Sequence, residues 1–295
     1  MKRISLVVAA AFLTAVAQSG CSSEVSARSA KDDAQTLSRA VELSGGFQSL
    51  SMSGVANVTF TRAEGEPSVV VTAAEDVLDL VTVELRDGTL YVSTKNMKNK
   101  DFRGKRIEVA ISCEKLGDVS LRGTGGLTCN DALTGQSVSV TASGTGGVNC
   151  LQGIEADVVS LRLSGTGGID AQRIACQRCS ADLSGTGGFH AGELKAEDVS
   201  LHLSGTGAMH IGGIEAKTVS AHNSGTGSIN LSGKAESAEY HSSGTGSVNA
   251  EELEVAHVSA HCSGVGKVNC YASETLQRST SGLGKVNCKG NPRLM

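Results

Sequence analysis

The sequence predicts an all-β fold, a parallel β-solenoid of about nine coils preceded by a less regular strand-rich segment. A Ser-Gly-Xaa-Gly motif recurs nine times at intervals of 18 to 21 residues, with Arg122 replacing Ser in the first copy. Apolar and polar residues alternate within each repeat, which is the period of a strand. A unit of roughly 20 residues is too short for a strand–helix–strand repeat. One coil per unit, with equivalent residues stacked in columns, is the compact arrangement that remains.

Residues 1–20 are predicted to be an export signal. Lys2 and Arg3 precede an apolar run, 4–17, which at fourteen residues is too short to span a bilayer. The QSGC that follows resembles the lipobox of bacterial lipoproteins, in which the cysteine is acylated and becomes the mature N-terminus. The resemblance makes Cys21 the lipidation site and membrane lipid a partner, although Gln18 stands where the family prefers an aliphatic residue. The alternative is an ordinary secretory signal with Cys21 as a spare thiol.

The segment after the predicted signal indicates attachment to the cell envelope. Ser22 follows the candidate lipid cysteine, whereas Asp at this position is the residue that favours retention in the inner membrane. The lipoprotein resemblance therefore implies an exported outer-membrane protein that faces the periplasm or the cell surface. Residues 21–43 are rich in Ser, Ala and charged side chains, which predicts a flexible tether.

Residues 44–121 are expected to form the strand-rich N-terminal part of the domain and its cap. Strands are predicted at 68–73, 81–85, 89–94 and 106–112, with a turn at 86–88, a helical turn at 75–80 and a solvated basic loop at 95–105. Such a part can cover one end of a solenoid, whose strand edges would otherwise stay open.

Residues 122–290 are predicted to form the regular solenoid repeats. Both glycines of the motif occur in every copy, which indicates a bend or a site too tight for a Cβ. Two outward polar ladders are expected, and stacked amides can bond from coil to coil. The first ladder consists of Thr166, Thr186, Thr206 and Thr226, and its column ends where Val265 and Leu283 replace threonine. The second ladder consists of Asn230, Asn249, Asn269 and Asn287.

The repeat SGTGG(I/V)(N/D) resembles the bacterial head GIN domain family. GSIN at 227–230 and GSVN at 246–249 carry the G-x-(I/V)-N core, and a strand-rich segment such as FQSLSMSGVANVTFTR precedes the repeats. The likeness covers 45–287. It implies a right-handed parallel β-helix, often behind a lipoprotein signal, in a family described as the head of autotransporter-type adhesins. It supplies no catalytic residues.

Eight cysteines follow Cys21 in what the export signal predicts to be an oxidising compartment. The candidate disulfides are Cys129–Cys150, Cys270–Cys288 and Cys176–Cys179. The first two pairs share columns in adjacent coils, about 4.8 Å apart, which suits a disulfide. The alternative is that they are buried small apolar side chains. The third pair forms a CxxC that could bridge within one turn, and the sequence lacks the thioredoxin-like setting of a redox motif.

A histidine column lies two residues before the motif serine. Its members are His202, His222, His241 and His261, with Asp182 one coil earlier. They have outward parity, so neighbouring rings could hold a transition metal. A straight ladder makes its ligands diverge, however, so the sequence favours a solvated stack of rings with no metal and no cofactor.

Composition narrows the functional classes. The formal net charge is −4 and aromatic residues are 3% of the chain, so neither a basic stripe nor stacking platforms for nucleic acid exist. We expect a lipid-anchored, non-catalytic module with a structural or adhesive binding role. Its expected ligand is a glycan or a protein at the cell surface, and no nucleic-acid partner is expected. The sequence leaves its oligomeric state open. The alternatives are a glycan-active β-helix enzyme using Asp170 and Asp182, a binder of an ice or mineral lattice, and a metal-binding surface protein.

Overall fold

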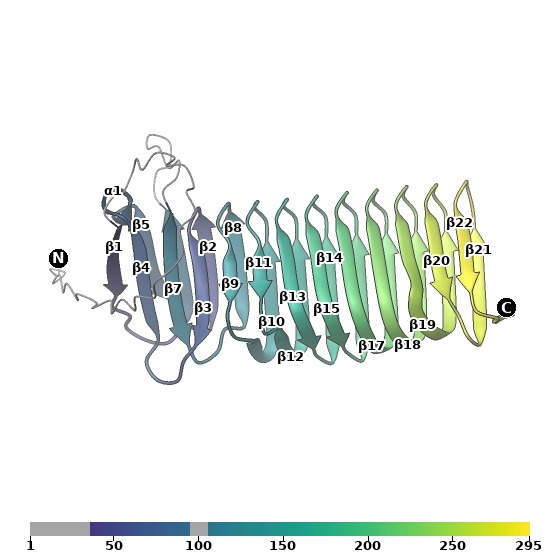
Figure 1. Ribbon diagram of the computed structural model, residues 1–295, viewed down its shortest axis with the longest axis horizontal. Coiled ribbons are helices and arrows are strands. Elements are labelled where there is room, and N and C mark those ends of the chain that lie inside the picture. Colours follow the sequence, from purple (N-terminus) through teal and green to yellow (C-terminus); the bar gives the residue numbers. More distant parts are fainter. Residues whose placement is uncertain (1–35, 95–105) are drawn as a thin grey trace, which may run out of the picture.

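The described chain is a rod of stacked β-coils. A computed structural model describes residues 36–94 and 106–295. The N-terminal strands lie at one end of the rod and the last coils at the other (Figure 1). Within these ranges the one helix, α1, spans Glu75–Leu78, and no helix is long and apolar enough to cross a membrane. The predicted all-β solenoid is confirmed.

Along the regular coils, each Ser-Gly-Xaa-Gly corner joins the strand before it to the strand after it. The strands before the corners are β8 (Asp118–Gly123), β10 (Leu133–Ala142), β12 (Ile154–Leu163), β14 (Arg178–Leu183) and β16 (Asp198–Leu203). Those after the corners are β9 (Leu127–Cys129), β11 (Val148–Cys150), β13 (Gly168–Ala175) and β15 (Gly188–Lys195). Further along, single strands run from one corner to the next: β17 (Ala208–Asn223), β18 (Ser228–Ser242) and β19 (Ser247–Cys262). The last are β20 (Lys267–Tyr271), β21 (Thr275–Thr280), β22 (Lys285–Lys289) and β23 (Arg293–Leu294).

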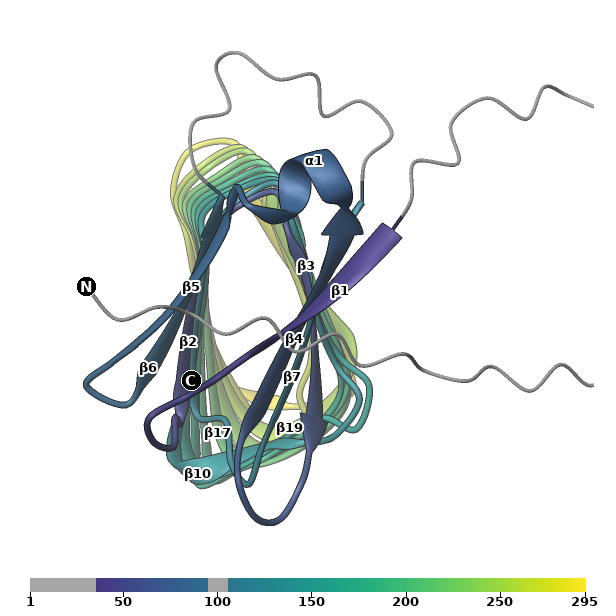
Figure 2. The same ribbon diagram turned by 90° about the vertical axis from the view of Figure 1, so that its left-hand side faces the viewer.

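Neighbouring coils pair in parallel and in register. Ile169 pairs with Phe189, Phe189 with Met209, and Met209 with Ile229. The two stacks of strands lie on opposite sides of the core, as their first members β2 (Ser49–Gly54) and β3 (Asn57–Arg62) show in the view along the rod (Figure 2). The strand and the parity of a residue therefore determine the face of the rod on which it lies.

Small and aliphatic side chains fill the interior. Val159, Leu161 and Leu163 on β12 are at most 2% exposed, and Ile169 across the corner is 1% exposed. Each fully buried aliphatic side chain contributes about 1.5–3 kcal/mol to the transfer free energy. The repetition of this contribution in every coil compensates for the shortage of aromatic residues.

The motif glycines are required because successive corners almost touch. From Gly123 to Gly266, a Cβ built on either motif glycine would lie 1.7 to 2.1 Å from a carbonyl oxygen of the preceding coil. A Cβ would thus point along the rod and collide with the neighbouring backbone. The faint copy of the motif carries Ala56 at the second glycine position. The neighbours of β2 and β3 on this side are β6 (Thr89–Thr94) and β7 (Ile107–Cys113), with which they pair.

The N-terminal strands are continuous with the solenoid. β2 and β3 pair in parallel with β8 and β9, so the corner at Gly54 stacks directly under the corner at Gly123. β4 (Ser68–Ala74) is antiparallel to β7, and β5 (Val81–Arg86) is antiparallel to β6. The predicted strands and the helical turn are all present. The predicted basic loop, 95–105, lies outside the described residues.

The predicted tether is wrong for its last residues. Thr36–Val41 form β1, which pairs antiparallel with β4. The segment is ordered because it supplies hydrogen-bond partners to β4, and because Leu37 and Val41 pack against the core. The predicted signal, Cys21 and the rest of the tether lie in 1–35, outside the described residues.

Candidate binding surface

An asparagine ladder runs along the strands that follow the corners. The side-chain amide of Asn249 donates to Oδ1 of Asn230 at 2.8 Å, and Asn269 donates to Asn249 at 2.9 Å. Asn287 extends the chain of bonds to Asn269 at 2.8 Å. An amide has two N–H donors and an oxygen with two lone pairs. Asn249 and Asn269 each use one donor and one acceptor position within the ladder, so they retain capacity for a ligand.

A hollow of about 350 Å³ opens beside this ladder. Its wall includes His210, Glu251 and Glu252 together with three of the ladder amides. The pairing register shifts between Ile211 and Ile214, and again between Asn230 and Ser232, so two adjacent bulges border the hollow. Because a bulge re-aims side chains, consecutive carboxylates face the same space. Glu251 is also held by Lys289 at 2.6 Å.

The predicted histidine column forms a stack of rings. Ring centroids are 5.0 Å apart for His202–His222, 4.6 Å for His222–His241 and 5.5 Å for His241–His261. Asp182 lies 3.8 Å from His202, and Glu239 lies 2.9 Å from His241.

Burial, and then the charges of His241 and His202, lower the pKa of His222. No group of three or more His, Cys, Asp or Glu side chains within the described ranges is arranged to hold a metal ion.

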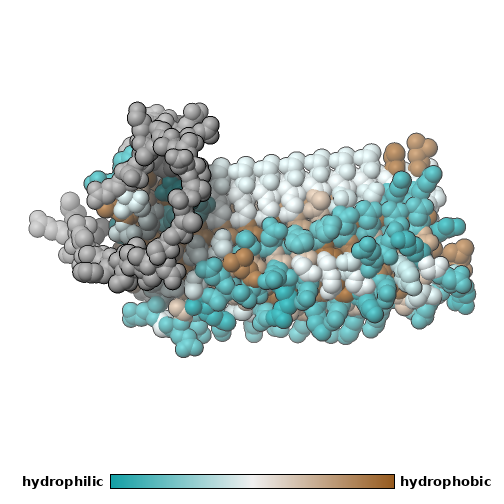
Figure 3. All heavy atoms as spheres, viewed as in Figure 1, coloured by the Kyte–Doolittle hydropathy of each residue, from teal (hydrophilic) through white to brown (hydrophobic). Residues whose placement is uncertain are grey.

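The corners form a straight ridge along the rod. Thr166, Thr186, Thr206 and Thr226 are exposed there, each two residues after an exposed serine. The ridge is a pale band along the upper edge of the molecule, with hydrophobic atoms towards the C-terminal end (Figure 3). Val265 and Leu283, which occupy the threonine position in the last two corners, are 58% and 79% exposed. The row of hydroxyl groups on the ridge is thus followed by apolar side chains at the C-terminal end of the rod.

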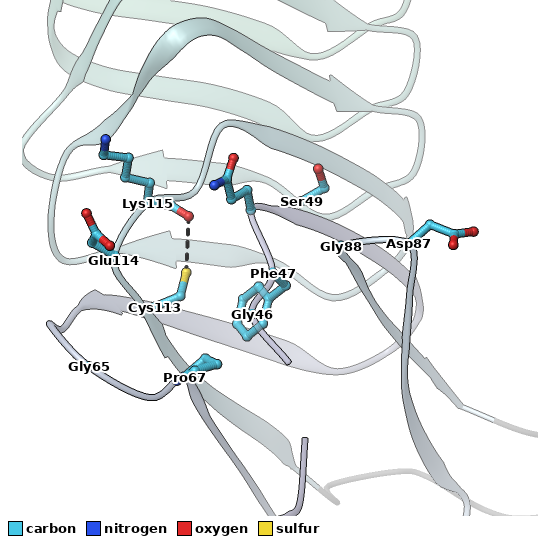
Figure 4. Close-up of a pocket in the computed structure, with 11 residues that line it drawn as sticks. Gly46, Phe47, Ser49, Gly65, Pro67, Asp87, Gly88, Cys113, Glu114 and Lys115 are labelled. Atoms are coloured by element: carbon cyan, nitrogen blue, oxygen red, sulfur yellow. Dashed lines mark hydrogen bonds between the residues drawn. The ribbon is translucent and has the colours of Figure 1, made fainter. Parts of the chain in front are cut away.

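A second hollow, of about 610 Å³, lies among the N-terminal strands. Its lining comes from the segment before β2, the β3–β4 and β5–β6 turns, and the end of β7. Phe47, Pro67 and Cys113 lie together at its centre (Figure 4). The Cys113 thiol donates to the Lys115 carbonyl oxygen at 3.3 Å, and burial raises the pKa of that thiol to about 11. No motif in the sequence marked this hollow, because its lining comes from four separate turns.

The structure brings the three predicted cysteine pairs together as free thiols. Cys129 and Cys150 pair in register, both fully buried, and Cys270 pairs in register with the half-buried Cys288. The hydrogen bond with Cys150, followed by burial, raises the pKa of Cys129 far above its usual value. Burial, followed by the neighbouring Cys288, does the same for Cys270. The side-chain contact with Cys179 lowers the pKa of Cys176.

The two candidate carboxylates of the glycan-enzyme alternative do not converge. Asp170 lies on β13, after a corner, and Asp182 lies on β14, before the next corner. These strands belong to the stacks on opposite sides of the core. Asp182 is instead 3.6 Å from Arg162 in the preceding coil.

Two further features were not predicted from the sequence. His190 and His210 precede the asparagines in the same column, with ring centroids 6.0 Å apart, and this extension could have been found by reading the column back towards the N-terminus. Tyr240 is fully buried between Ala221 and Ala260, and its hydroxyl has no hydrogen-bond partner among the described residues.

The family model described as "Putative auto-transporter adhesin, head GIN domain" matches residues 46–213 and 204–292. The two matches together cover most of the chain. The chain belongs to this family. Membership in an adhesin-type family fits an adhesive or binding module, and it implies an exported cell-surface or envelope protein.

The chain is similar to several solved structures. A "putative adhesin" from Parabacteroides merdae is 18% identical over 89% of this chain and 92% of that chain, with a TM-score of 0.53. A "putative adhesin" and a "Putative lipid binding protein", both from Parabacteroides distasonis, are 18% and 16% identical over 89% of this chain and 93% of theirs, each with a TM-score of 0.45. No curated protein matches the sequence.

Proposed function

We propose that this GIN-domain chain is a non-catalytic binding module of the cell envelope, anchored by lipid at Cys21, whose asparagine ladder contacts an extended glycan. The observation that carries the proposal is the row of hydrogen-bonded amides at 230–287 beside the hollow with Glu251 and Glu252. Amide and carboxylate groups in a hollow match the hydroxyl groups of sugars, which are both donors and acceptors.

The geometry of the row favours a repetitive ligand. Parallel pairing fixes the amides at intervals of about 4.8 Å. Their mutual hydrogen bonds hold the side chains in one orientation before any ligand arrives, and such preorganisation lowers the entropic cost of binding. A single sugar would use one or two of these amides, whereas an extended glycan can use them together and gain from multivalency.

A glycan array tests the ligand. We expect the purified protein to bind extended glycans without releasing reducing ends, and Asn249→Ala to weaken binding about tenfold, a loss typical of one or two hydrogen bonds. The matched control is Asn149→Ala, since Asn149 occupies the same column between Thr128 and Asp170, outside the amide ladder. Equal binding by the two variants would contradict the ladder as the contact surface. Release of reducing ends would revive the enzyme alternative, and binding to immobilised proteins alone would assign the surface to a protein ligand.

The anchor is tested in cells. Metabolic labelling with palmitate is expected to mark the wild-type chain and not Cys21→Ser. Protease treatment of intact cells is expected to degrade the rod, since an adhesive module has to face outward. Full protection of the rod would indicate a periplasmic role instead.

The exposed threonine ridge favours binding of an ordered lattice as a second candidate. Its hydroxyl groups repeat at a fixed interval for at least four coils, from Thr166 to Thr226. Thermal hysteresis of the purified protein, lost in Thr206→Val, would support this candidate, and its absence would dismiss ice as the lattice.

A further inference from the structure

The turn between β13 and β14 holds two cysteines in a fixed arrangement. Cys176 directly follows β13, and Cys179 is the second residue of β14. The Cys176 amide donates to the Lys195 carbonyl of the next coil at 2.9 Å, and the Gln177 amide donates to Asp157 of the preceding coil at 3.0 Å. Because both neighbouring coils hold the turn, its backbone keeps the two cysteine side chains beside each other.

The two thiols differ in access. Cys179 is 2% exposed and stands in the interior column between Val159 and Val199. Cys176 is half-buried, next to the exposed Gln177. The neighbouring coils carry Ala156 and Ala196 at the position of Cys176, so its sulfur is added where they have only a methyl group. The Cys176 thiol is therefore partly exposed to solvent, whereas the Cys179 thiol is buried in the core.

The electrostatics of the pair match this difference in access. The hydrogen bond from Cys179 lowers the pKa of Cys176, whereas that same contact, followed by burial, raises the pKa of Cys179. Thiolate is the form that attacks a disulfide. Of the other two pairs, Cys129 and Cys150 are both fully buried. Cys270 is buried beside the half-buried Cys288, but each of these two thiols donates to a backbone carbonyl, at 3.5 and 3.1 Å.

We propose that Cys176 and Cys179 form a redox-active dithiol site that exchanges with external disulfides, with Cys176 as the attacking sulfur and Cys179 as the resolving sulfur. The CxxC motif needs no thioredoxin-like domain for this exchange, because the turn itself places a partly exposed thiol beside a buried one. The proposal is independent of the proposed binding function.

The exchange has two steps. The Cys176 thiolate attacks one sulfur of the external disulfide, the old S–S bond breaks, and the other sulfur leaves as a thiolate that takes up a proton. The Cys179 thiol then loses its proton to solvent and its sulfur attacks Cys176, which breaks the mixed disulfide and releases the second external thiol. Two electrons pass from the dithiol to the external disulfide, which becomes two thiols.

The test uses the purified, reduced full chain and oxidised glutathione as the disulfide. Samples are quenched by alkylation and mapped by mass spectrometry. Trypsin cleaves after Arg178, so a Cys176–Cys179 bond joins two peptides that are otherwise separate. We expect this cross-link to form at least about tenfold faster than any modification of Cys129 or Cys150.

Two variants assign the roles, and both are chosen to preserve packing. Cys179→Val matches Val159 and Val199, and Cys176→Ala matches Ala156 and Ala196. In Cys179→Val, a glutathione adduct should accumulate on Cys176, because no resolving thiol remains. In Cys176→Ala, no adduct should form on Cys179.

Three results would overturn the proposal: an adduct on Cys179 in Cys176→Ala, no stable adduct on Cys176 in Cys179→Val, or oxidation of Cys270–Cys288 before Cys176–Cys179 in the wild type. Thermal melting of both variants under reducing conditions shows whether they remain folded. Loss of the fold in one variant leaves the wild-type order of cross-linking as the deciding measurement.

Discussion

The second motif glycine illustrates how a single residue controls this rod. Gly187 is that glycine and Gly188 follows it in the same corner, yet the two meet different surroundings. A Cβ on Gly187 would lie 1.7 Å from the Gly167 carbonyl oxygen. A Cβ on Gly188 would lie 3.7 Å from the Ala208 carbonyl oxygen, which is ordinary contact. Ala208 occupies the equivalent position in the next coil, so a methyl group is already accepted there.

We therefore expect Gly187→Ala to destabilise the fold by about 1–3 kcal/mol or more, since the corners would have to separate. Gly188→Ala should be neutral or stabilise by up to about 1 kcal/mol, because alanine reduces the freedom of the unfolded chain. Denaturant unfolding of both variants measures the difference. Equal losses would show that glycine flexibility, and not contact between corners, explains the motif.

The buried Tyr240 hydroxyl gives a second prediction. A hydroxyl that loses water on folding and gains no partner costs about 1–3 kcal/mol. Tyr240→Phe keeps the ring and removes this cost, so we expect an unchanged or higher midpoint of denaturant unfolding. A marked loss of stability in Tyr240→Phe would mean that a bound water satisfies the hydroxyl.

The ladders are properties of neighbouring strands and not of single residues. His222 lies on β17, between His202 on β16 and His241 on β18, because parallel pairing is in register. Burial makes protonation of the middle ring unfavourable, and the charges of the imidazoles on either side add to the effect. Glu239 opposes the shift but does not cancel it. The same stacking produces order among the asparagines, which are neutral and can bond to each other.

The histidine ladder should make stability depend on pH. In the folded protein the pKa of His222 is below its usual value of 6.5, so the unfolded chain binds more protons as the pH falls through that value. We expect the melting temperature to be lower at pH 5 than at pH 8, and His222→Gln to reduce this drop. The control is His257→Gln, because His257 lies outside the ladder and contacts Glu274 at 3.6 Å. Identical melting at the two pH values would contradict the prediction.

At the N-terminal end of the rod, β1 controls exposure of the sheet edge. β1 pairs with β4, which pairs with β7 on its other side, so β1 covers what would otherwise be a free edge. Arg39 ties β1 further to the start of β5, donating to the Val81 carbonyl at 3.0 Å. Open edges of this kind promote pairing between molecules.

Removal of β1 should therefore cause self-association. A chain that begins at residue 42 is expected to elute from size-exclusion chromatography as larger species and to melt at a lower temperature. A chain that begins at residue 36 is the control, since it keeps β1. If both truncated chains elute as the same species, β1 does not protect the edge.

The sequence by itself determined the solenoid, the two glycine columns and the polar ladders. This was achievable because each coil repeats the same local pattern, so a regular period of about 20 residues translates directly into stacking. It also placed two cysteine pairs together through their shared columns, and the third through its CxxC spacing within one turn.

Only the tertiary structure decided the remaining features. The order of β1 depends on the edge of a strand some thirty residues later. The reason for the glycines depends on the distance between successive corners, and both hollows depend on turns or bulges from different coils. The separation of Asp170 from Asp182, and the difference in access between Cys176 and Cys179, follow from which way each side chain faces around the core. A linear pattern shows that residues recur, whereas burial and contact are set by the neighbours that the fold brings to them.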